Sequence, residues 1–324
     1  MNKNIVLLEG EKNISLPELN QKIWTLFDAL DINPNTLKDY KMRTTLFTEY
    51  LKTEGVNRNT YIGYKKYLDS RSDFSVSTKA KYLTVSKTIL KELNRLGYLP
   101  VDITTATKGF KQNKKHKKDG LNDEEITNLI KTVRSLPFSP INLRLKAILG
   151  LLIFQGLRQI EITRLNAEDL DLSRNTVLVQ GKGRDDKEIV YLHPETVVAL
   201  TEYLKCWKIK SGALFPSQSN NSKHARLTTR SIRGIVKSFL TSLCIPKTTH
   251  GFRHYFTTTL IKTYKGDLLE VAQYTRHRGL EMLQVYNDTI RHEADLPRYY
   301  SAFNGVSFGA QNQAPTSDNS NYRK

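Results

Sequence analysis

The stretch Gly156-Leu157-Arg158-Gln159-Ile160-Glu161 is the clearest guide to how the second half of this sequence folds. It follows a strongly apolar segment, Leu143 to Phe154, whose length and composition predict a buried helix. The glycine ends that helix, and Arg158 then lies at the start of the next one, with Glu161 one turn later. An arginine that opens a helix beside an apolar core is more often a surface or capping residue, so this stretch alone identifies no activity.

The residues that follow predict a small sheet. Thr176 to Val179 and Glu188 to Leu192 have the apolar pattern of two strands, and Gly181-Lys182-Gly183 lies in the turn between them. A lysine at such a tip is usually only solvated. These glycines also lack the spacing and the serine or threonine of a phosphate-binding loop.

A third stretch, His250-Gly251-Phe252-Arg253-His254, carries a histidine and an arginine at positions i and i+3. Residues at that spacing lie on the same face of a helix. His277 and Tyr286 follow, separated by a turn and most of a short helix. Each has an ordinary explanation when taken singly, since a helical His–Arg pair can serve packing and the chain has 16 tyrosines.

Around these stretches the second half of the chain has a mostly helical pattern. Asn122 or Asp123 can cap a helix whose first turn is acidic, which suits the positive end of the helix dipole. Further helices are expected at Thr196 to Lys208, Thr229 to Leu243 and His250 to Tyr264, with two short ones around Leu269 and Met282.

The preceding part, Leu16 to Leu99, is predicted to be an all-helical domain. Ser77 or Thr78 can cap its third helix, which Gly97 and Pro100 end. Six lysines crowd the segment that follows: Lys108, Lys111, Lys114, Lys115, Lys117 and Lys118. Such a run is either a solvated linker or a phosphate contact, and a basic tether along a DNA backbone would be both.

Composition narrows the class of protein. The 324 residues carry a formal net charge of +18, which favours a polyanionic partner, and DNA is the commonest one. A ribosome-associated protein, an RNA enzyme or a basic proteome would give the same charge. The two cysteines, Cys206 and Cys244, form no disulfide framework or metal-spaced pair, and no apolar run approaches a membrane span. We therefore expect a protein of the reducing cytoplasm with no membrane partner.

The sequence lacks the usual signs of metal-dependent chemistry. His292-Glu293 is not followed by a second histidine one helical turn later, as a zinc helix requires. No acidic cluster suits the two metal ions of a two-metal nuclease. We expect neither a metal nor another cofactor.

In their order along the chain, six candidate residues resemble the active site of the tyrosine recombinase (phage integrase) family: Arg158, Lys182, His250, Arg253, His277 and Tyr286. The resemblance covers about Leu121 to Tyr300 and, more loosely, the helical part before it. It implies the tyrosine recombinase fold, which is mainly α, with a helical core-binding domain and a mostly helical catalytic domain that holds a small antiparallel sheet. The sequence departs from the family at Tyr274-Thr275-Arg276, where a Leu-Gly step is common, and at Phe252, where leucine is commoner.

The resemblance also implies a reaction. The protein would be a site-specific DNA recombinase that cleaves and rejoins strands through a 3′-phosphotyrosine intermediate, with no metal or ATP. Tyr286 would be the nucleophile, and Arg158 and Arg253 would clamp the phosphate. His250 and His277 would add hydrogen bonds to the same oxygens.

Two further residues complete the implied site. Lys182 would act as the general acid for the leaving hydroxyl, and Glu161 would be a supporting residue that orients Arg158 or a neighbour. The double-stranded DNA would contain specific crossover sites, on which the protein would assemble as a homotetramer. An accessory directionality protein is compatible with this scheme.

The expected organisation is an N-terminal extension (1–15), a core-binding domain (16–103), a basic linker (104–120), a catalytic domain (121–303) and a tail that is disordered when alone (304–324). The chain begins too close to the core-binding domain for an arm-binding domain, which favours the simple two-domain type. Two alternatives stay open: a non-catalytic DNA-binding regulator, and an enzyme that relaxes supercoils like a type IB topoisomerase.

Overall fold

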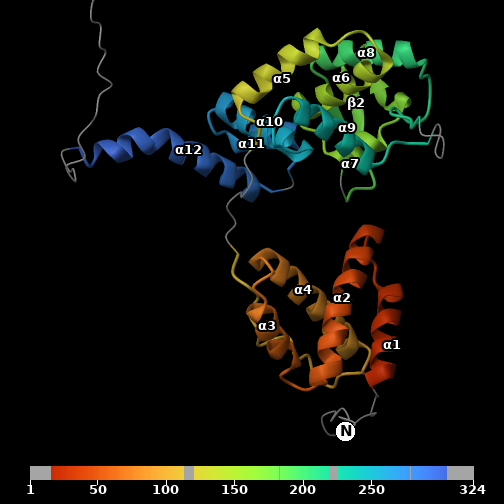
Figure 1. The fold of residues 1–324 in the computed structure, drawn as a ribbon, viewed down its shortest axis with the longest axis vertical. Helices are drawn as coiled ribbons and strands as arrows, with labels where there is room; N and C mark the ends of the chain where they lie inside the picture. Colours follow the sequence, from red (N-terminus) through yellow and green to blue (C-terminus); the bar gives the residue numbers. More distant parts are fainter. Residues whose placement is uncertain (1–15, 113–119, 182, 219–224, 278, 305–324) are drawn as a thin grey trace, which may run out of the picture. The chain divides into compact units, whose positions relative to one another are not determined.

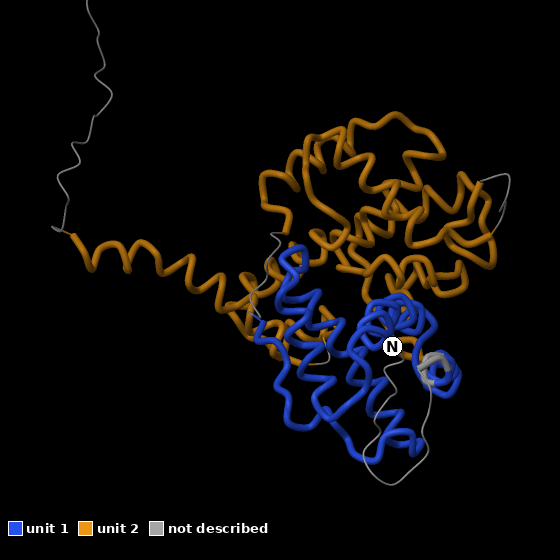
Figure 2. The backbone as a smooth tube through the Cα atoms, turned by 60° about the horizontal axis from the view of Figure 1, so that its bottom comes forward, with its two compact units in different colours: residues 1–114 blue, residues 115–324 orange. Residues whose placement is uncertain are grey.

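The computed structural model describes residues 16–112, 120–181, 183–218, 225–277 and 279–304. The chain divides into two compact units, residues 1–114 and 115–324, which Figure 2 distinguishes by colour. The division falls inside the segment that the sequence predicts to be a basic linker. Each unit is described by itself.

The first unit is all helical (Figure 1), with α1 (Leu16–Leu26), η1 (Phe27–Ala29), α2 (Pro34–Glu54), α3 (Thr60–Ser70) and α4 (Val76–Arg95). Local sequence explains the helix ends. The Asn33 side chain caps α2 with Pro34 in its first turn, and Ser75 caps α4 by accepting from the Thr78 backbone N–H. The predicted cap at Ser77 or Thr78 was therefore two or three residues too late. Gly97, with φ of 78°, follows the end of α4.

Aromatic and aliphatic side chains fill the core of the first unit. Phe47 and Tyr64 are fully buried, with ring centroids 4.8 Å apart, and Leu51, Leu68 and Leu93 surround them. Beyond α4, Phe110 packs against this same core. Part of the predicted linker therefore lies on the first unit.

The second unit is also mainly helical. Its helices are α5 (Asp123–Ser135), α6 (Pro140–Ile153), α7 (Gln159–Arg164), η2 (Ala167–Asp169), α8 (Pro194–Trp207), α9 (Thr229–Ser242), α10 (Thr249–Thr263), α11 (Leu268–Thr275) and α12 (Glu281–Ser301). The strands β1 (Leu170–Asp171), β2 (Thr176–Gln180) and β3 (Lys187–Tyr191) form an antiparallel sheet in the order β1-β2-β3. The predicted fold class is thereby confirmed. Two details differ, because β1 was not predicted and the helix around Met282 has 21 residues instead of being short.

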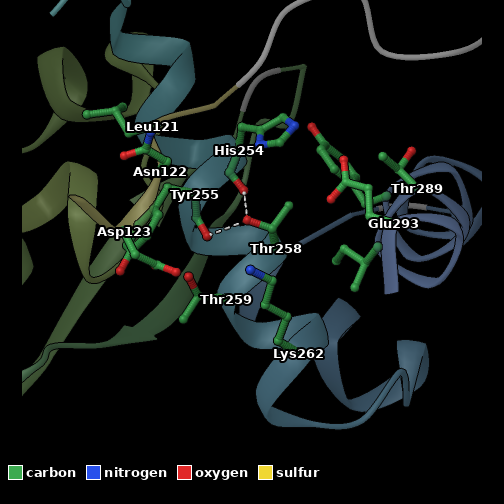
Figure 3. A pocket seen from close by; sticks show the side chains of 12 residues that line it. Leu121, Asn122, Asp123, His254, Tyr255, Thr258, Thr259, Lys262, Thr289 and Glu293 are labelled. Carbon is green, nitrogen blue, oxygen red and sulfur yellow. Dashed lines mark hydrogen bonds between the residues drawn. The ribbon is translucent and has the colours of Figure 1, made fainter. Parts of the chain in front are cut away.

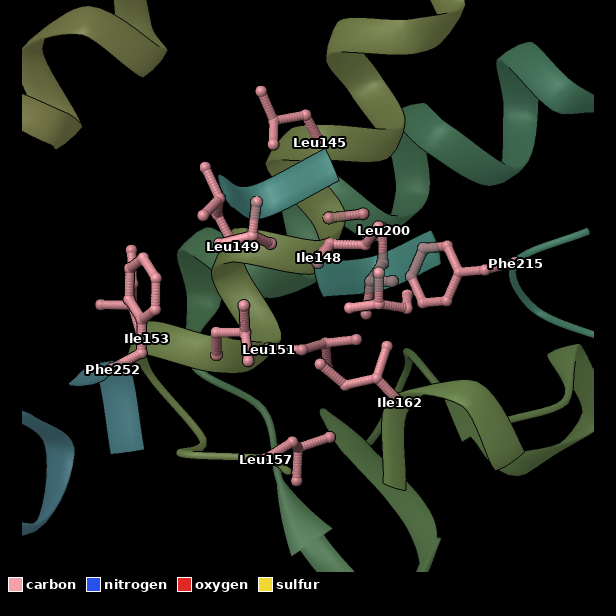
Figure 4. Close-up of a cluster of buried hydrophobic side chains, with 14 of the residues drawn as sticks. Leu145, Ile148, Leu149, Leu151, Ile153, Leu157, Ile162, Leu200, Phe215 and Phe252 are labelled. Atoms are coloured by element: carbon pink, nitrogen blue, oxygen red, sulfur yellow. The ribbon is translucent and has the colours of Figure 1, made fainter. Parts of the chain in front are cut away.

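Helix α6 forms the centre of the second unit (Figure 4). Its apolar residues from Leu143 onward, including Ile148 and Leu151, are buried, and Ile162 of α7, Leu200 of α8 and Phe252 of α10 complete the cluster. Gly150 lies against Thr196 of α8, where a Cβ would come within 3.1 Å of the hydroxyl. The α6–α7 turn, where Arg158 lies, is thus fixed by a dry core.

A smaller apolar cluster holds the C-terminal helices together. Ile261 of α10, Val271 of α11 and Leu283 and Tyr286 of α12 are all buried in it. Beyond Ile290, the rest of α12 is almost entirely exposed. Within the described ranges, no helix is both long enough and apolar enough to cross a lipid bilayer.

Candidate active site

Arg158 and Glu161 form the first part of the site, as the predicted helix start requires. Arg158 is the N-cap of α7, and its guanidinium donates to Glu161 Oε1 at 2.7 Å. Glu161 Oε2 accepts the backbone N–H of Arg158 at 2.8 Å. Glu161 is fully buried, and although burial opposes ionisation, the charges of Arg276 and Arg158 hold its pKa below the usual value. Glu161 thus holds both the backbone and the guanidinium of Arg158, and its supporting role in catalysis stays a prediction.

Arg253 joins two turns of the chain that are far apart in sequence. Its guanidinium donates to the carbonyl of Gly156 at 2.7 Å and to the carbonyl of Thr275 at 2.6 Å. Only 4% of Arg253 is exposed, and this burial, together with the charge of Arg158, lowers its pKa to about 10. Gly156 has φ of 57°, and a Cβ there would collide with the Phe256 ring. Glycine is therefore required in the turn whose carbonyl Arg253 binds.

Arg276 belongs to the same cluster, although the sequence analysis treated it only as a departure from the family. Its side chain is 5% exposed, and its guanidinium donates to Glu161 Oε2 at 2.9 Å. A second carboxylate, Glu188 of β3, lies 3.8 Å from Arg276 Nη1. The signal that could have pointed to it was a charged side chain at a position where the family usually has glycine.

The two predicted histidines occupy different surroundings. His277 follows the end of α11, and its Nδ1 lies 2.7 Å from the Thr275 hydroxyl. Burial, followed by the charges of Arg253 and Arg158, lowers the pKa of His277 to about 4, so the ring is neutral at pH 7. His250 lies in the first turn of α10 and is exposed, whereas Arg253 three residues later is buried.

Tyr286 lies in the first half of α12 and is only 6% exposed. Its ring packs edge-on against the ring of His254, with centroids 4.8 Å apart. Burial raises the pKa of the Tyr286 phenol, and the charge of Arg253 opposes that rise. The phenol is therefore in reach of the electrostatic field of the arginine cluster.

A pocket lined by Tyr286 lies between parts of α10 and α12 (Figure 3). Figure 3 shows His254 and Lys262 of α10 on one side of it and Thr289 and Glu293 of α12 on the other. Residues from the start of the unit also line it. Gly120 lies so close to His254 that an added Cβ would collide with the imidazole, and the Leu121 backbone N–H donates to the Gly251 carbonyl at 3.4 Å.

Lys182 lies outside the described residues, but both sides of its hairpin are held in place. The Gly181 carbonyl accepts from Arg164 of α7 at 3.2 Å. On the other side of the turn, Arg184 pairs with Glu188 of β3 at 2.7 Å. The hairpin is thus attached at Gly181 to α7, the helix that Arg158 caps.

The predicted DNA-binding lysines are only partly within the described residues. Lys108 and Lys111 are exposed. The other four predicted positions, Lys114, Lys115, Lys117 and Lys118, lie outside them. Among the described residues there is no group of three His, Cys, Asp or Glu side chains placed to hold a metal ion.

A comparison with known protein families covers the part of the chain that contains these site residues. The model of the phage integrase family matches residues 120–292, which include all six candidate catalytic residues. The chain belongs to the phage integrase family. Its predicted recombinase function is therefore favoured over the regulator and the topoisomerase-like alternatives.

Relatives that resemble this integrase-family chain carry the name tyrosine recombinase. It is 27% identical to the tyrosine recombinase XerC of Oceanobacillus iheyensis over 267 residues, covering 78% of this chain and 85% of the relative. It is 28% identical to the tyrosine recombinase XerA of Pyrococcus horikoshii, covering 74% and 86%. Among solved structures, a XerH site-specific recombinase bound to a palindromic difH substrate has a TM-score of 0.71 at 18% identity, covering 93% and 91%. The last comparison shows the shared fold.

Proposed function

We propose that Tyr286 is the nucleophile with which this tyrosine recombinase cleaves DNA, and that Arg158 and Arg253 bind the scissile phosphate. The supporting observation is the cluster of three guanidinium groups, from Arg158, Arg253 and Arg276, around the fully buried carboxylate of Glu161. The excess of positive charge suits a phosphodiester, whose negative charge grows in the pentavalent transition state. Removing one such donor should cost about 3–4 kcal/mol, a hundredfold to a thousandfold in rate.

The reaction that we propose is the one that the resemblance to the family implies. The phenol oxygen of Tyr286 forms a bond to the phosphorus while the bond to the 5′ oxygen breaks, which leaves a 3′-phosphotyrosine and a free 5′ hydroxyl. The new ester keeps the bond energy, so the reverse attack by a hydroxyl of a different strand needs no ATP. With guanidinium groups to bind the phosphate, the scheme also needs no metal.

Two proton transfers accompany the bond changes. Because burial raises the pKa of Tyr286, the phenol is protonated at neutral pH and needs a base when it attacks. His250 is our candidate for assisting that step. Lys182 is our candidate for protonating the leaving 5′ oxygen. His277, neutral at pH 7, would donate a hydrogen bond to a phosphate oxygen.

The partner that we propose is double-stranded DNA containing a specific crossover sequence, bound in the cytoplasm. Residues 16–103 would form the core-binding domain and residues 121–303 the catalytic domain, with the lysine-rich segment between them following the DNA backbone. An interface that neutralises roughly six to ten phosphates should lose about three to five orders of magnitude in affinity between 50 and 200 mM salt. A filter-binding titration at several salt concentrations measures this slope.

Recombination between two duplexes needs four active sites, and we propose a homotetramer on DNA. In α12, the exposed side chains of Tyr299 and Tyr300, with Phe303 just beyond the helix, form an aromatic group in which the ring of Tyr299 lies 5.6 Å from each of the other two. Deleting the chain from Tyr299 should abolish cooperative assembly on paired sites and leave single-site binding intact. Loss of single-site binding as well would contradict the proposed docking role. A mobile genetic element and an accessory directionality protein fit this scheme.

The proposal is tested by trapping the covalent intermediate. Purified protein is mixed with nicked duplexes that tile the DNA flanking its own gene, denatured in detergent and separated by electrophoresis. The wild-type protein and the control Tyr264→Phe should form a protein–DNA adduct, whereas Tyr286→Phe should form none. An equal adduct in Tyr286→Phe would refute the assignment of the nucleophile. Tight binding without any adduct would favour the regulator instead, and supercoil relaxation without strand exchange would favour the topoisomerase-like alternative.

A further inference from the structure

Arg276 has a backbone conformation that is unfavourable for any residue other than glycine, so its side-chain contacts must offset this cost. It follows the last residue of α11 with φ of 56° and ψ of 42°, in the left-handed region that glycine adopts without strain. An arginine at this position is strained relative to glycine. The side chain is nevertheless almost completely buried in the site, so its contacts have to account for its presence.

Those contacts link two parts of the active site. On one side, Arg276 donates to Glu161, which in turn binds the backbone and guanidinium of Arg158. On the other side, its Nη1 faces Glu188, which binds Arg184 of the β2–β3 hairpin. Charges therefore alternate along a continuous chain from the clamp at the start of α7 to the hairpin. Lys182 lies in that hairpin, two residues before Arg184 in the sequence.

Two donors of the Arg276 guanidinium are unsatisfied in the described part of the chain, and one of them faces Glu188 of the hairpin. The Nε and Nη1 of Arg276 are buried and have no hydrogen-bond partner among the described residues. Buried donors of a charged group are costly to leave unpaired. The Glu188 carboxylate, 3.8 Å from Nη1, is placed to satisfy one of them if β3 moves toward α11 by a fraction of an ångström.

We propose that Arg276 is a positioning residue that couples the β2–β3 hairpin, through Glu188, to the phosphate clamp at Arg158, through Glu161. This inference rests on the proposed function, because its effect on the reaction is the placing of the Lys182 general acid against a clamped phosphate. Arg276 itself need not touch the DNA. Its two carboxylate partners give β3 a preferred distance from the clamp.

The coupling predicts a specific kinetic defect in Arg276→Gln, which keeps most of the volume and removes the charge. Adduct formation at saturating DNA should slow by about tenfold to a hundredfold, the size expected for a misplaced catalytic group. The dissociation constant for DNA should change little. A duplex in which sulfur replaces the bridging oxygen of the leaving group tests the cause, because a thiolate leaves without a general acid. On that duplex the defect should shrink to less than about threefold.

Matched variants separate positioning from damage to the fold. Glu188→Gln should show the same sulfur rescue with a smaller loss, because it breaks only the hairpin side of the chain. Arg276→Lys should recover part of the rate. Arg174→Gln removes an exposed arginine that pairs with Asp171 at 3.7 Å, away from this chain of charges, and should behave like the wild type.

Hydrogen exchange gives a readout that does not require activity. The backbone amides of the hairpin should exchange faster in Arg276→Gln and in Glu188→Gln than in the wild type and in Arg174→Gln. Unchanged exchange, or an equal rate loss on the oxygen and sulfur duplexes, would overturn the inference. If the wild-type protein forms no adduct on either duplex, the proposed function fails, whereas the exchange result still decides whether Arg276 holds the hairpin.

Discussion

The two units bury different kinds of side chain. In the described part of the first unit the buried residues are apolar or carry hydroxyl groups, as Tyr64 and Thr44 do, and none is charged. The second unit buries Glu161, Arg253 and the side chain of Arg276 beside an equally dry aliphatic core. Removing charges from water is costly, and apolar residues of similar size often give equal or greater stability. The core of the first unit therefore contributes stability alone. The second unit is less stable than an all-apolar core would make it, because it holds charges where the proposed chemistry needs them.

The largest effect should come from Arg253→Gln. Two buried carbonyls, of Gly156 and Thr275, would lose their charged donor, which should destabilise the second unit by about 4 kcal/mol and lower adduct formation at least a hundredfold. Arg43→Gln in the first unit is the matched control. The Arg43 side chain is 12% exposed and pairs with the more exposed Asp39 at 2.9 Å, so its loss should cost about 1–2 kcal/mol. Urea denaturation measures the loss in free energy of unfolding for each variant. Equal losses would contradict the difference between the two units.

Glu161→Gln should have the next largest effect. Burial of this carboxylate is tolerated because Arg158 and Arg276 surround it, so neutralising it leaves two guanidinium groups in mutual repulsion. We expect a loss of about 3 kcal/mol in stability and of tenfold to a hundredfold in adduct formation. Asp39→Asn in the first unit is the control, with an expected cost below about 1 kcal/mol. A Glu161→Gln protein as stable and active as the wild type would show that the arginines do not depend on this carboxylate.

Much of this arrangement could be predicted from the sequence. The start of α7 at Arg158, the hairpin around Gly181 and the helix that carries Arg253 all depend on local signals, namely glycines, apolar periodicity and caps. The pairing of Arg276 with Glu161 could not be predicted, because it joins residues 115 positions apart through tertiary contacts. The length of α12 was also underestimated, since its second half has no apolar face packed in the described unit and contains Pro297.

Lowering the pH should destabilise the second unit more than the first, by a smaller amount than the two substitutions above. The pKa of His277 is about 4 in the folded protein and near 6.5 when unfolded. As the pH falls from 6.5 toward 4, the unfolded chain therefore binds a proton that the folded chain does not, and stability declines. The contribution is fully present above pH 6.5, and about 1–2 kcal/mol should be lost by pH 4 because the ring is only partly buried.

Unfolding at pH 7, 5.5 and 4.5 measures this loss, which His277→Gln should reduce. Residues 1–114 contain no histidine, so unfolding of the first unit should show no matching decline over the upper part of this range. An equal decline in both units would contradict the assignment to His277.

The smallest effect should come from the first unit. Within the described part of the chain the buried Tyr64 hydroxyl has no hydrogen-bond partner, and burial raises the pKa of this phenol strongly. Tyr64→Phe removes an unsatisfied group and keeps the ring contacts with Phe47 and Tyr50, so it should leave stability unchanged or raise it by up to about 1 kcal/mol. Thermal denaturation measures the change. Marked destabilisation would show that the packing of the first unit depends on this polar group after all.

Gly120 lies against the imidazole of His254, and this close contact has a mechanical consequence. Covalent connection makes Gly120 the point at which the second unit receives any pull from the segment that leads to the first. The next contacts inward are the imidazole of His254 and then the ring of Tyr286. A displacement of the chain at Gly120 would therefore reach the ring of Tyr286, the proposed nucleophile, through a single intervening side chain.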